Sequence, residues 1–424
     1  MRILAFLVLL SLSHSLAAQS GQGFSAVARP EDAGMSSERL QRIDRLVTEA
    51  IARGEIPGAV VFIARGGRVV YHKAYGSRAP GTPMRRDDIF RIASQSKAIT
   101  SLAVMLLWEE GRFQLNDPIG RYLPEFSKPQ VLKSFNPADS SWTAEPAKKP
   151  LTIRHLLTHT SGIDYAAIGS TEFQAIYAKA GVPSGIGNDG RTIGETMRAL
   201  GGLPLKHEPG ERFTYSLGLD VLGYFVEVIS GMPFDQFLRT RIFEPLGMKD
   251  TWFYLPSDRA GRLVTLHDGE SGKAVPRQEP VWDGVNPDYP RLKGTYFSGG
   301  AGLSSTVEDY ARFLQLFLNQ GEFNGVRLLS PKTVELILTE QFPDLKAEYG
   351  LAFGLETSDN DYQSPRSLGS FSWGGAYATT YWADPKEDLI AQLYTNMVNS
   401  AAAWAMGQRF TTLTYGAIVK LRER

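Results

Sequence analysis

The amino-acid sequence predicts an α/β chain of the α+β type, in which an antiparallel sheet is formed from both chain ends and flanked by helices, with a mainly helical lobe between them. Strand-like runs cluster near both ends, and helix-like runs fill the middle. The first two strand-like runs, in "GAVVFIARGGRVVYHKAYG", are separated only by Gly66 and Gly67. So short a loop requires antiparallel pairing, and one sheet built from both termini is the simplest architecture that uses all the strands.

Two helices are expected early in the chain. The first follows Ser36 or Ser37, either of which would cap it, and Gly54 ends it. Its apolar residues recur at helical spacing and are Leu40, Ile43, Val47 and Ile51. The second helix runs from about Ser94 to Glu110 and is apolar on nearly every side, so we expect it in the middle of the molecule.

The remaining elements follow from the same patterns. The stretch 128–150 is rich in turn residues and predicts a surface excursion. Helices with clear apolar faces are expected near 152–158, 216–230, 306–319 and 331–338, with a final helix over about 402–421. The runs "YGLAFGLE", "AYATTYWADP" and "DLIAQLYTN" predict three strands near the C-terminus.

The domain organisation expected from these elements is a signal peptide at 1–18, a linker at 19–35 and one large domain at 36–424. Within that domain, the sheet lobe covers about 36–93 and 300–424, and the helical lobe covers about 94–299. Residues 1–18 combine one arginine, a short apolar stretch and small residues, with cleavage expected after Ala17 or Ala18. We therefore expect a periplasmic or secreted protein.

Composition excludes several classes of function. Lys+Arg and Asp+Glu both number 45, so no overall field favours nucleic acid, and no nucleic-acid partner is expected. The chain has no cysteine and therefore no disulfide framework or lipid-modified cysteine. The apolar runs at the N-terminus and in "AITSLAVMLLW" are too short to span a bilayer, so we expect no stable membrane insertion after signal cleavage. A monomer is expected.

Ser94 and Lys97 are the first candidates for chemistry. They lie three residues apart in "RIASQSKAIT", at the start of the apolar helix, and on a helix this spacing places both side chains on one face. Burial disfavours the ammonium form of Lys97 and makes a neutral amine available as a general base. The Ser94 amide, unpaired at a helix start, can face a developing oxyanion. The alternative is a capping serine with a lysine that reaches the surface.

The surrounding segments resemble the serine β-lactamase and penicillin-binding-protein-like superfamily, in its class C β-lactamase-like and family VIII carboxylesterase branch. The resemblance rests on "SQSK" together with "LTIRHLLTHTSGI", "PGERFTYSLGLDVLG", "SGGAGLSSTVEDYARF" and "SWGGAYATTYWADP", in that order, and extends from about Ser36 to the C-terminus. It implies a β-lactamase-like or transpeptidase-like fold and an acyl-serine intermediate on Ser94.

The resemblance also assigns residues of the second and third family motifs. It implies that Tyr215 shares proton transfer with Lys97, whereas Leu217 replaces the asparagine of the Tyr-x-Asn form. Trp373, Gly374 and Gly375 align with the third motif. The two glycines would let substrate lie against the strand edge, and the amide of Ala376, next in the chain, would be the second oxyanion donor.

Rival constellations have weaker support. His155 and His159 have the spacing of a metal pair on a helix, but no glutamate follows His155 directly and no third ligand is evident. A role of His159 in bracing its loop is favoured instead. The Gly-x-Ser-x-Gly elbow of α/β-hydrolases is absent, and "SGGAGLSS" lacks the Gly-Lys-Ser/Thr of a phosphate loop. No metal and no cofactor are expected.

The function predicted from the sequence is that of an exported serine hydrolase that acts on a small-molecule ester or amide substrate, with small esters as the leading substrates. The first alternative is a class C-like β-lactamase or a D-amino-acid-specific peptidase on the same scaffold. The second is a non-catalytic cell-wall binding protein that keeps the fold. The apolar residues Trp373 and Leu217 favour esters over lactams, whose carboxylate and side chain call for a cation and an amide. Substrate choice is expected to depend on the segments 128–150 and 164–200.

Overall fold

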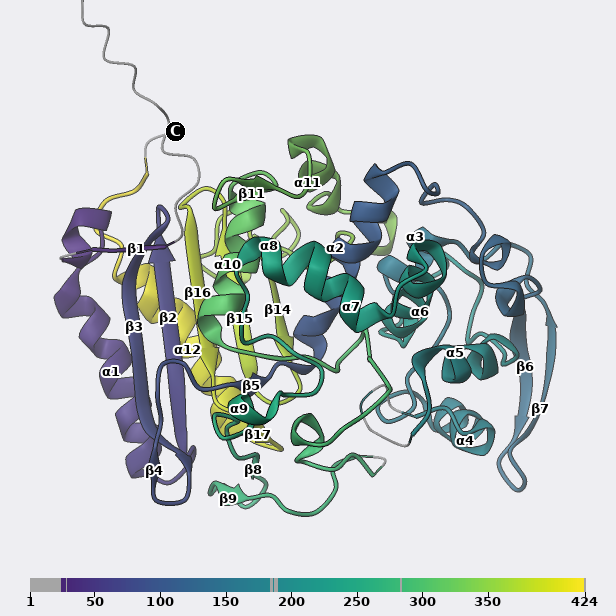
Figure 1. The fold of residues 1–424 in the computed structure, drawn as a ribbon, viewed down its shortest axis with the longest axis horizontal. Coiled ribbons are helices and arrows are strands. Elements are labelled where there is room, and N and C mark those ends of the chain that lie inside the picture. The colour runs from purple at the N-terminus through teal and green to yellow at the C-terminus, as the bar shows by residue number, and fades with distance from the viewer. Residues whose placement is uncertain (1–23, 28, 184–185, 187–189, 283, 423–424) are drawn as a thin grey trace, which may run out of the picture.

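The computed structural model describes residues 24–27, 29–183, 186, 190–282 and 284–422 (Figure 1). The predicted signal peptide, 1–18, lies outside these residues. Part of the segment 19–35, expected to be a linker, contributes to the fold: Ser25–Ala26 forms the short strand β1, which pairs in parallel with β3, and Pro30–Ala33 forms a 3-10 turn. Met35, at its end, is fully buried.

One large sheet joins the two chain ends. Its strands lie in the order β1-β3-β2-β16-β15-β14-β13, and β4 pairs with β3. Strand β2 from the N-terminal region pairs antiparallel with β16 from the C-terminal region, so the predicted architecture is confirmed, with β1 as a parallel exception. The bounds are β2 Gly58–Arg65, β3 Arg68–Ala79, β4 Thr82–Pro83, β13 Gly354–Leu355, β14 Phe371–Gly375, β15 Thr379–Asp384 and β16 Leu389–Tyr394.

Helices cover both faces of this sheet (Figure 1). Every residue of β2 is buried, and alternate side chains point to opposite faces. Ala59, Val61 and Ile63 pack in one apolar core with α1 (Ser37–Ala52) and α12 (Ala401–Gly416). Val60, Phe62 and Ala64 pack in the other core with α2 (Ser96–Glu109) and α10 (Val307–Leu318). The sheet is therefore the middle layer of a helix–sheet–helix arrangement.

The predicted helix ends are largely confirmed. The Ser36 side chain accepts a hydrogen bond from the Arg39 amide and caps α1. All residues of α2 from Ser96 to Leu107 are buried, as the all-round apolar pattern requires. The last helix ends at Gly416 rather than near 421, because the following residues pair with the start of the domain: Ala417 accepts from the Ser36 amide, and the Val419 amide donates to Gly34.

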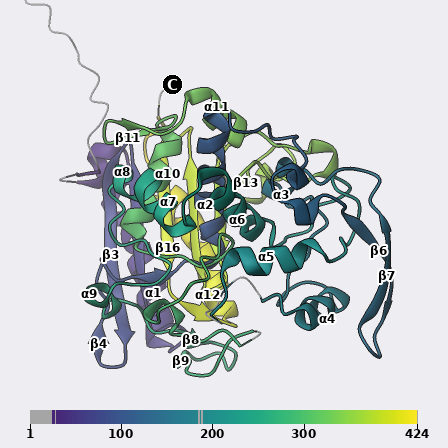
Figure 2. The same ribbon diagram turned by 45° about the vertical axis from the view of Figure 1, so that its right-hand side comes forward.

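The middle of the chain forms the helical lobe, of which α3, α4 and α5 lie on the right in Figure 1 and Figure 2. Helix α6 is central to it and packs against α2, α3, α5 and α7. The helices of this lobe are α3 Ile153–Leu157, α4 Thr171–Ala180, α5 Ile193–Gly201, α6 Gly218–Ser230, α7 Phe234–Leu238 and α8 Glu244–Leu246, with a π-helical turn at Arg239–Phe243.

A hairpin at the edge of this lobe was not predicted. The stretch expected to be a turn-rich excursion contains β6 (Gln130–Asn136) and β7 (Ser141–Pro146), which lie at the far right in both ribbon views (Figure 2). The Leu132 amide donates to the Leu205 carbonyl at 2.8 Å, which ties the hairpin to the helical lobe. Proline and lysine residues flank the hairpin, and for this reason its half-buried apolar residues were not recognised as strands in the sequence.

Short elements complete the fold. The segment "YGLAFGLE" gives only β13 rather than a full strand. The remaining elements are β5 Phe90–Arg91, β8 His267–Asp268, β9 Val275–Pro276, β10 Ser304–Ser305, β11 Glu322–Phe323, β12 Val326–Arg327, β17 Met397–Val398, α9 Ser257–Ala260 and α11 Pro331–Ile337, with 3-10 turns at Ala93–Gln95, Ile119–Arg121, Pro124–Phe126, Tyr289–Arg291, Pro343–Leu345 and Asp361–Gln363. None of the helices in the described ranges is long and apolar enough to span a membrane.

Candidate active site

Ser94 lies at the junction between the sheet and the central helix. It is the middle residue of the 3-10 turn Ala93–Gln95, which leads directly into α2. Ala93 has a φ of 42°, a left-handed conformation that is unusual for a residue with a side chain. Ser94 is partly exposed, whereas its neighbours on both sides are buried. The turn thus presents one hydroxyl at the surface of an otherwise buried segment.

Lys97 is buried, at 1% exposure, and its amine reaches back to this hydroxyl. Its Nζ lies 3.4 Å from Ser94 Oγ, as the i, i+3 spacing predicts. The same amine donates to the Gly300 carbonyl at 2.7 Å and lies 3.4 Å from the hydroxyl of Tyr165. The lysine does not extend to solvent, so the alternative of a surface-reaching side chain is wrong.

Tyr215 completes the predicted group. It lies just before α6, and its ring centroid is 4.5 Å from the Lys97 amine. The ring of Tyr165 stacks on that of Tyr215, with centroids 5.6 Å apart and an angle of 11° between planes. The Tyr215 hydroxyl oxygen is buried and has no hydrogen-bond partner within the described part of the chain. The ring thus packs over the Lys97 amine, while the hydroxyl makes no hydrogen bond to Lys97 or to Ser94 among the described residues.

His159 holds the segment that carries Tyr215. Its backbone carbonyl accepts from the Thr214 amide at 2.7 Å, and its Nδ1 accepts from the Ser216 amide at 3.2 Å. Complete burial and the nearby Lys97 lower the pKa of His159 well below its usual value, so the ring stays neutral. The predicted bracing role therefore corresponds to contacts on both sides of Tyr215.

Strand β14 brings the third motif to Ser94. A Cβ atom on Gly375 would lie 2.3 Å from the carbonyl oxygen of Ile92, so only glycine permits the strand to approach the turn this closely. Ala376, the next residue, is exposed. Outside the regular elements of the described chain, no backbone hydrogen bond uses the amide of Ser94 or of Ala376. Both donors are thus free for another acceptor.

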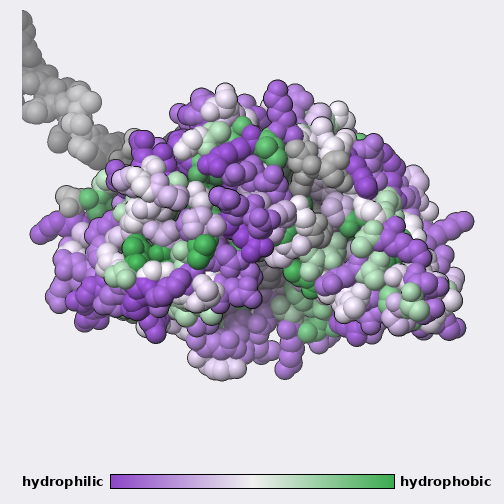
Figure 3. All heavy atoms as spheres, turned by 90° about the horizontal axis from the view of Figure 1, so that it is seen from below, coloured by the Kyte–Doolittle hydropathy of each residue, from purple (hydrophilic) through white to green (hydrophobic). Residues whose placement is uncertain are grey.

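Trp373 contributes an aromatic wall. Its ring centroid lies 5.8 Å from that of Tyr215 and 5.2 Å from that of Tyr349, which meets it edge-on. Gly374, beside it, is partly exposed. Leu217, by contrast, is fully buried in the main apolar core and cannot contact a ligand. From below, the molecular surface is hollowed near its middle, with hydrophobic surface gathered beside the hollow (Figure 3).

Two residues close to Lys97 were not predicted. Tyr165 follows "SGI" in a loop and carries no spacing signal that would point to Lys97. Asp220 lies in the first turn of α6, is fully buried, and is the only charged residue in the apolar run "LGLDVLGYFV". A single acidic residue in an apolar run could have been recognised from the sequence as a candidate functional residue.

The glycines of "SGGAGLSS" explain how these groups come together. A Cβ on Gly299 would lie 2.3 Å from the Leu219 carbonyl, and a Cβ on Gly300 would lie 2.4 Å from Asp220 Oδ2 and 3.4 Å from Lys97 Nζ. The segment therefore passes between α2 and α6 where no side chain fits. Its glycines serve close packing rather than phosphate binding.

The two histidines of the rival metal hypothesis make separate contacts. His155 Nδ1 accepts from the Thr152 amide at 3.2 Å and completes the cap of α3. His159 accepts from Ser216, as described above. Among the described residues, no group of three or more His, Asp or Glu side chains could hold a metal ion.

Comparison with known proteins decides the family. The sequence profile of the family described as Beta-lactamase matches residues 43–414. The chain belongs to the β-lactamase family. Esterase EstB of Burkholderia gladioli is 33% identical over 373 residues, which are 84% of this chain and 90% of that protein. Lovastatin esterase of Penicillium rubens is 30% identical over 82% of this chain and 90% of its own length.

Other members of the β-lactamase family have different described activities. A putative D-alanyl-D-alanine carboxypeptidase of Escherichia coli K12 is 26% identical over 95% of this chain and 92% of its own length. The solved structure of EstCE1, described as a hydrolase with promiscuous acyltransferase activity, has a TM-score of 0.77 and 27% identity, covering 89% of this chain and 98% of its own. The protein is thus a serine hydrolase of the β-lactamase family, with esterase, acyltransferase and carboxypeptidase relatives.

Proposed function

We propose that the protein is an exported carboxylesterase that acts on small esters through an acyl-serine intermediate on Ser94. The position of Lys97 carries this proposal, because its buried amine lies 3.4 Å from Ser94 Oγ and 4.5 Å from the Tyr215 ring. The esterase relatives support the reaction class. No cofactor takes part in the proposed reaction.

Lys97 and Tyr215 act together on the proton in this mechanism. As Ser94 Oγ bonds to the carbonyl carbon, its proton passes to the Lys97–Tyr215 pair, and the pair returns the proton to the departing alkoxide, which leaves as the alcohol. Water then attacks the acyl-serine by the same route and releases the carboxylic acid. The unpartnered Tyr215 hydroxyl supports its part in the transfer.

The amides of Ser94 and Ala376 form the proposed oxyanion hole. The Ser94 amide lies in the turn that leads into the central helix, and the Ala376 amide follows the end of β14. The close approach of Gly375 to Ile92 holds these two segments together. Two preorganised donors at a developing oxyanion contribute on the order of 100-fold or more each to the rate. Trp373 and Gly374 line the strand edge on which the acyl group would lie.

Intact-mass spectrometry tests this function. Wild type is incubated with a fluorophosphonate, with p-nitrophenyl esters and with a cephalosporin, and Ser94→Ala and Ser96→Ala are treated in parallel. Ser96 is a matched control, since its buried hydroxyl accepts from the Leu303 amide at 3.1 Å and points away from the site. We expect one phosphonyl group on wild type and on Ser96→Ala, and none on Ser94→Ala. Equal labelling of Ser94→Ala would exclude Ser94 as the nucleophile.

The same experiment separates the alternatives. A β-lactamase would turn over the cephalosporin faster than any ester, and a D-amino-acid-specific peptidase, suggested by the Escherichia coli relative, would release D-alanine from a D-alanyl-D-alanine peptide added to the panel. A non-catalytic cell-wall binding protein would take up none of the probes. The aromatic wall of Trp373 and Tyr349 favours the ester outcome, because it offers apolar contact and no charge.

Export is the second part of the proposal. It rests on the residue pattern of 1–18, with its arginine, apolar stretch and small residues before the expected cleavage site. N-terminal sequencing of the protein recovered from the periplasm or medium would give a start at residue 18 or 19. Recovery of uncleaved protein from the cytoplasm alone would contradict export.

A further inference from the structure

Asp220 is a buried acid that the proposed mechanism does not use. It is fully buried in the first turn of α6, five residues after Tyr215. An acidic residue in the first turn of a helix is common, but such residues normally accept bonds from the free amides there. In the described chain, neither carboxylate oxygen of Asp220 has a hydrogen-bond partner of good geometry. Its position therefore calls for another explanation.

Gly300 connects this carboxylate to Lys97. The Gly300 carbonyl accepts a 2.7 Å hydrogen bond from the Lys97 amine, and a Cβ added to Gly300 would lie 2.4 Å from Asp220 Oδ2. The two charged groups face each other across a single glycine, without forming a direct ion pair within the described residues. When Lys97 is protonated, the two opposite charges stabilise each other.

Asp220 carries its charge at neutral pH. Burial raises its pKa to about 6, and the Ser298 hydroxyl, the Lys97 ammonium and the Gly300 amide limit the rise. The other titratable groups around Lys97 are Tyr165 and Tyr215, whose rings pack on it, and His159, which burial keeps neutral. Asp220 is thus the acid whose charge acts on the Lys97–Tyr215 pair.

We propose that Asp220 is a positioning residue for acylation, and that its carboxylate is the buried counter-charge of the ammonium formed when Lys97 takes up the Ser94 proton. The inference rests on the proposed function of Ser94 and Lys97. The proton is still passed between Ser94, the Lys97–Tyr215 pair and the leaving alcohol, and Asp220 neither gains nor loses one. Its charge strengthens the base and holds the amine on the Gly300 side of the site.

The pH dependence of Ser94 labelling by a fluorophosphonate tests this proposal. An anion nearby disfavours proton loss from both Lys97 and Tyr215, so its removal moves the rising limb to lower pH whichever of them acts as the base. For Asp220→Asn we expect the midpoint to fall by about one pH unit and the plateau rate to fall by about 10-fold, since a weaker base remains. A purely structural role would change the rate or the folded fraction but not the midpoint.

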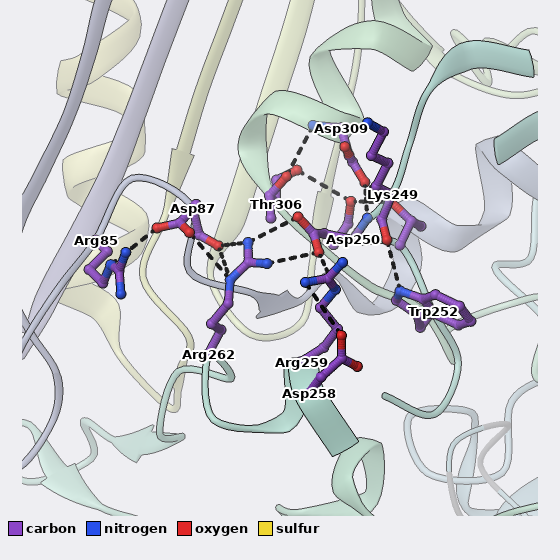
Figure 4. Close-up of polar contacts among 12 residues, drawn as sticks. Arg85, Asp87, Lys249, Asp250, Trp252, Asp258, Arg259, Arg262, Thr306 and Asp309 are labelled. Carbon is purple, nitrogen blue, oxygen red and sulfur yellow. Dashed lines mark hydrogen bonds and ion pairs between the residues drawn. The ribbon is translucent and has the colours of Figure 1, made fainter. Parts of the chain in front are cut away.

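Asp309→Asn is the matched control. Asp309 is also buried, its pKa is also raised to about 6 by burial, and it lies at the start of α10 within a separate charged cluster (Figure 4). Its replacement should leave the midpoint unchanged. If Asp220→Asn does not fold, Ser298→Ala removes the hydroxyl that favours the Asp220 charge and should give a smaller shift of the same sign.

The outcomes are distinct. A midpoint that stays in place or rises in folded Asp220→Asn would overturn the inference while leaving the proposed function intact. Absence of Ser94 labelling in wild type would instead overturn the proposed function. A shift in Asp309→Asn equal to that in Asp220→Asn would show a general charge effect and would also overturn the inference.

Discussion

Two buried aspartates with the same raised pKa, about 6, lie in opposite kinds of surroundings. Asp309 is satisfied: its Oδ2 accepts from the Asp250 amide at 2.7 Å and from the Thr251 hydroxyl at 3.0 Å. Asp220 has no hydrogen bond of good geometry and faces Lys97 across Gly300. The two carboxylates are thus both buried and have similar pKa values, but they differ in role. Asp309 organises a loop, whereas Asp220 is left available to a reacting group.

The surroundings of Asp309 extend the contrast. Figure 4 shows Asp250, beside it, in a network with Arg262 and Arg259, and Arg262 also reaches Asp87. These ion pairs join the segment around α9 to the segment after β4. In the active site, polar atoms of Tyr215, His159 and Asp220 remain without partners in the described chain. The charged cluster thus joins segments of the fold, whereas these three polar side chains gather around Lys97.

The largest expected difference between the two regions is in catalysis. Tyr215→Phe keeps the ring over Lys97 but removes the hydroxyl, and we expect kcat/KM for p-nitrophenyl butyrate to fall by about 100-fold or more. Tyr224→Phe, on the helix α6 that follows Tyr215, loses only a bond from Arg198 near the surface and should retain its activity. Steady-state kinetics at constant pH measures both. If Tyr215→Phe remained active, Tyr165 would replace Tyr215 as the tyrosine proposed to take part in proton transfer.

The next effect concerns substrate charge. A β-lactam carboxylate would meet Trp373 where a cation is needed, and loss of a charge-assisted hydrogen bond costs about 1.5 to 3 kcal/mol. We expect kcat/KM for p-nitrophenyl acetate or butyrate to exceed that for benzylpenicillin or cephalothin by roughly 100-fold. Trp373→Lys should narrow this ratio. Efficient penicillin turnover with negligible esterase activity would reverse the assignment of the site.

Stability gives a third contrast, because burying the charged Asp220 carboxylate lowers the free energy of unfolding. Its folded pKa, about 6, lies above the ordinary value of 3.8, so its contribution to stability is fully present below pH 3.8 and is lost as the pH rises through 6. Asp220→Asn should therefore be more stable than wild type by about 2 to 3 kcal/mol at pH 8, with the difference vanishing near pH 3.8. Urea unfolding at the two pH values measures it. A loss of stability at pH 8 would show that Asp220 makes a favourable contact in the fold.

The smallest effect is expected in the charged cluster. Arg262 donates to both Asp250 oxygens, at 2.8 and 3.0 Å, and its side chain is 17% exposed. Arg262→Ala should lower the free energy of unfolding by about 1 to 2 kcal/mol, as expected for a half-buried bidentate pair. Its labelling midpoint should match wild type. A changed midpoint would mean that the cluster and the active site are electrostatically coupled.

Much of the fold could be predicted because its signals are local. The Gly66-Gly67 hairpin, the Ser36 cap and the uniformly apolar α2 each depend on neighbouring residues. The β6–β7 hairpin could not, since its pairing with Leu205 depends on a distant segment and its turn-rich flanks obscure the alternation. Tyr165 was missed for the same reason, because it reaches Lys97 only through tertiary packing, whereas Asp220 could have been recognised as the one acid in an apolar run.

The pairing of β2 with β16 also determines when the protein can fold. Val60 and Tyr394 are partners in the sheet although about 330 residues of chain separate them. During synthesis the N-terminal hairpin therefore waits with an open edge until the last strands emerge, and closure of so long a loop is slow. The central sheet is therefore complete only when β16, near the end of the chain, has been made. Fragments that stop before β16 would expose the edge of β2 and aggregate.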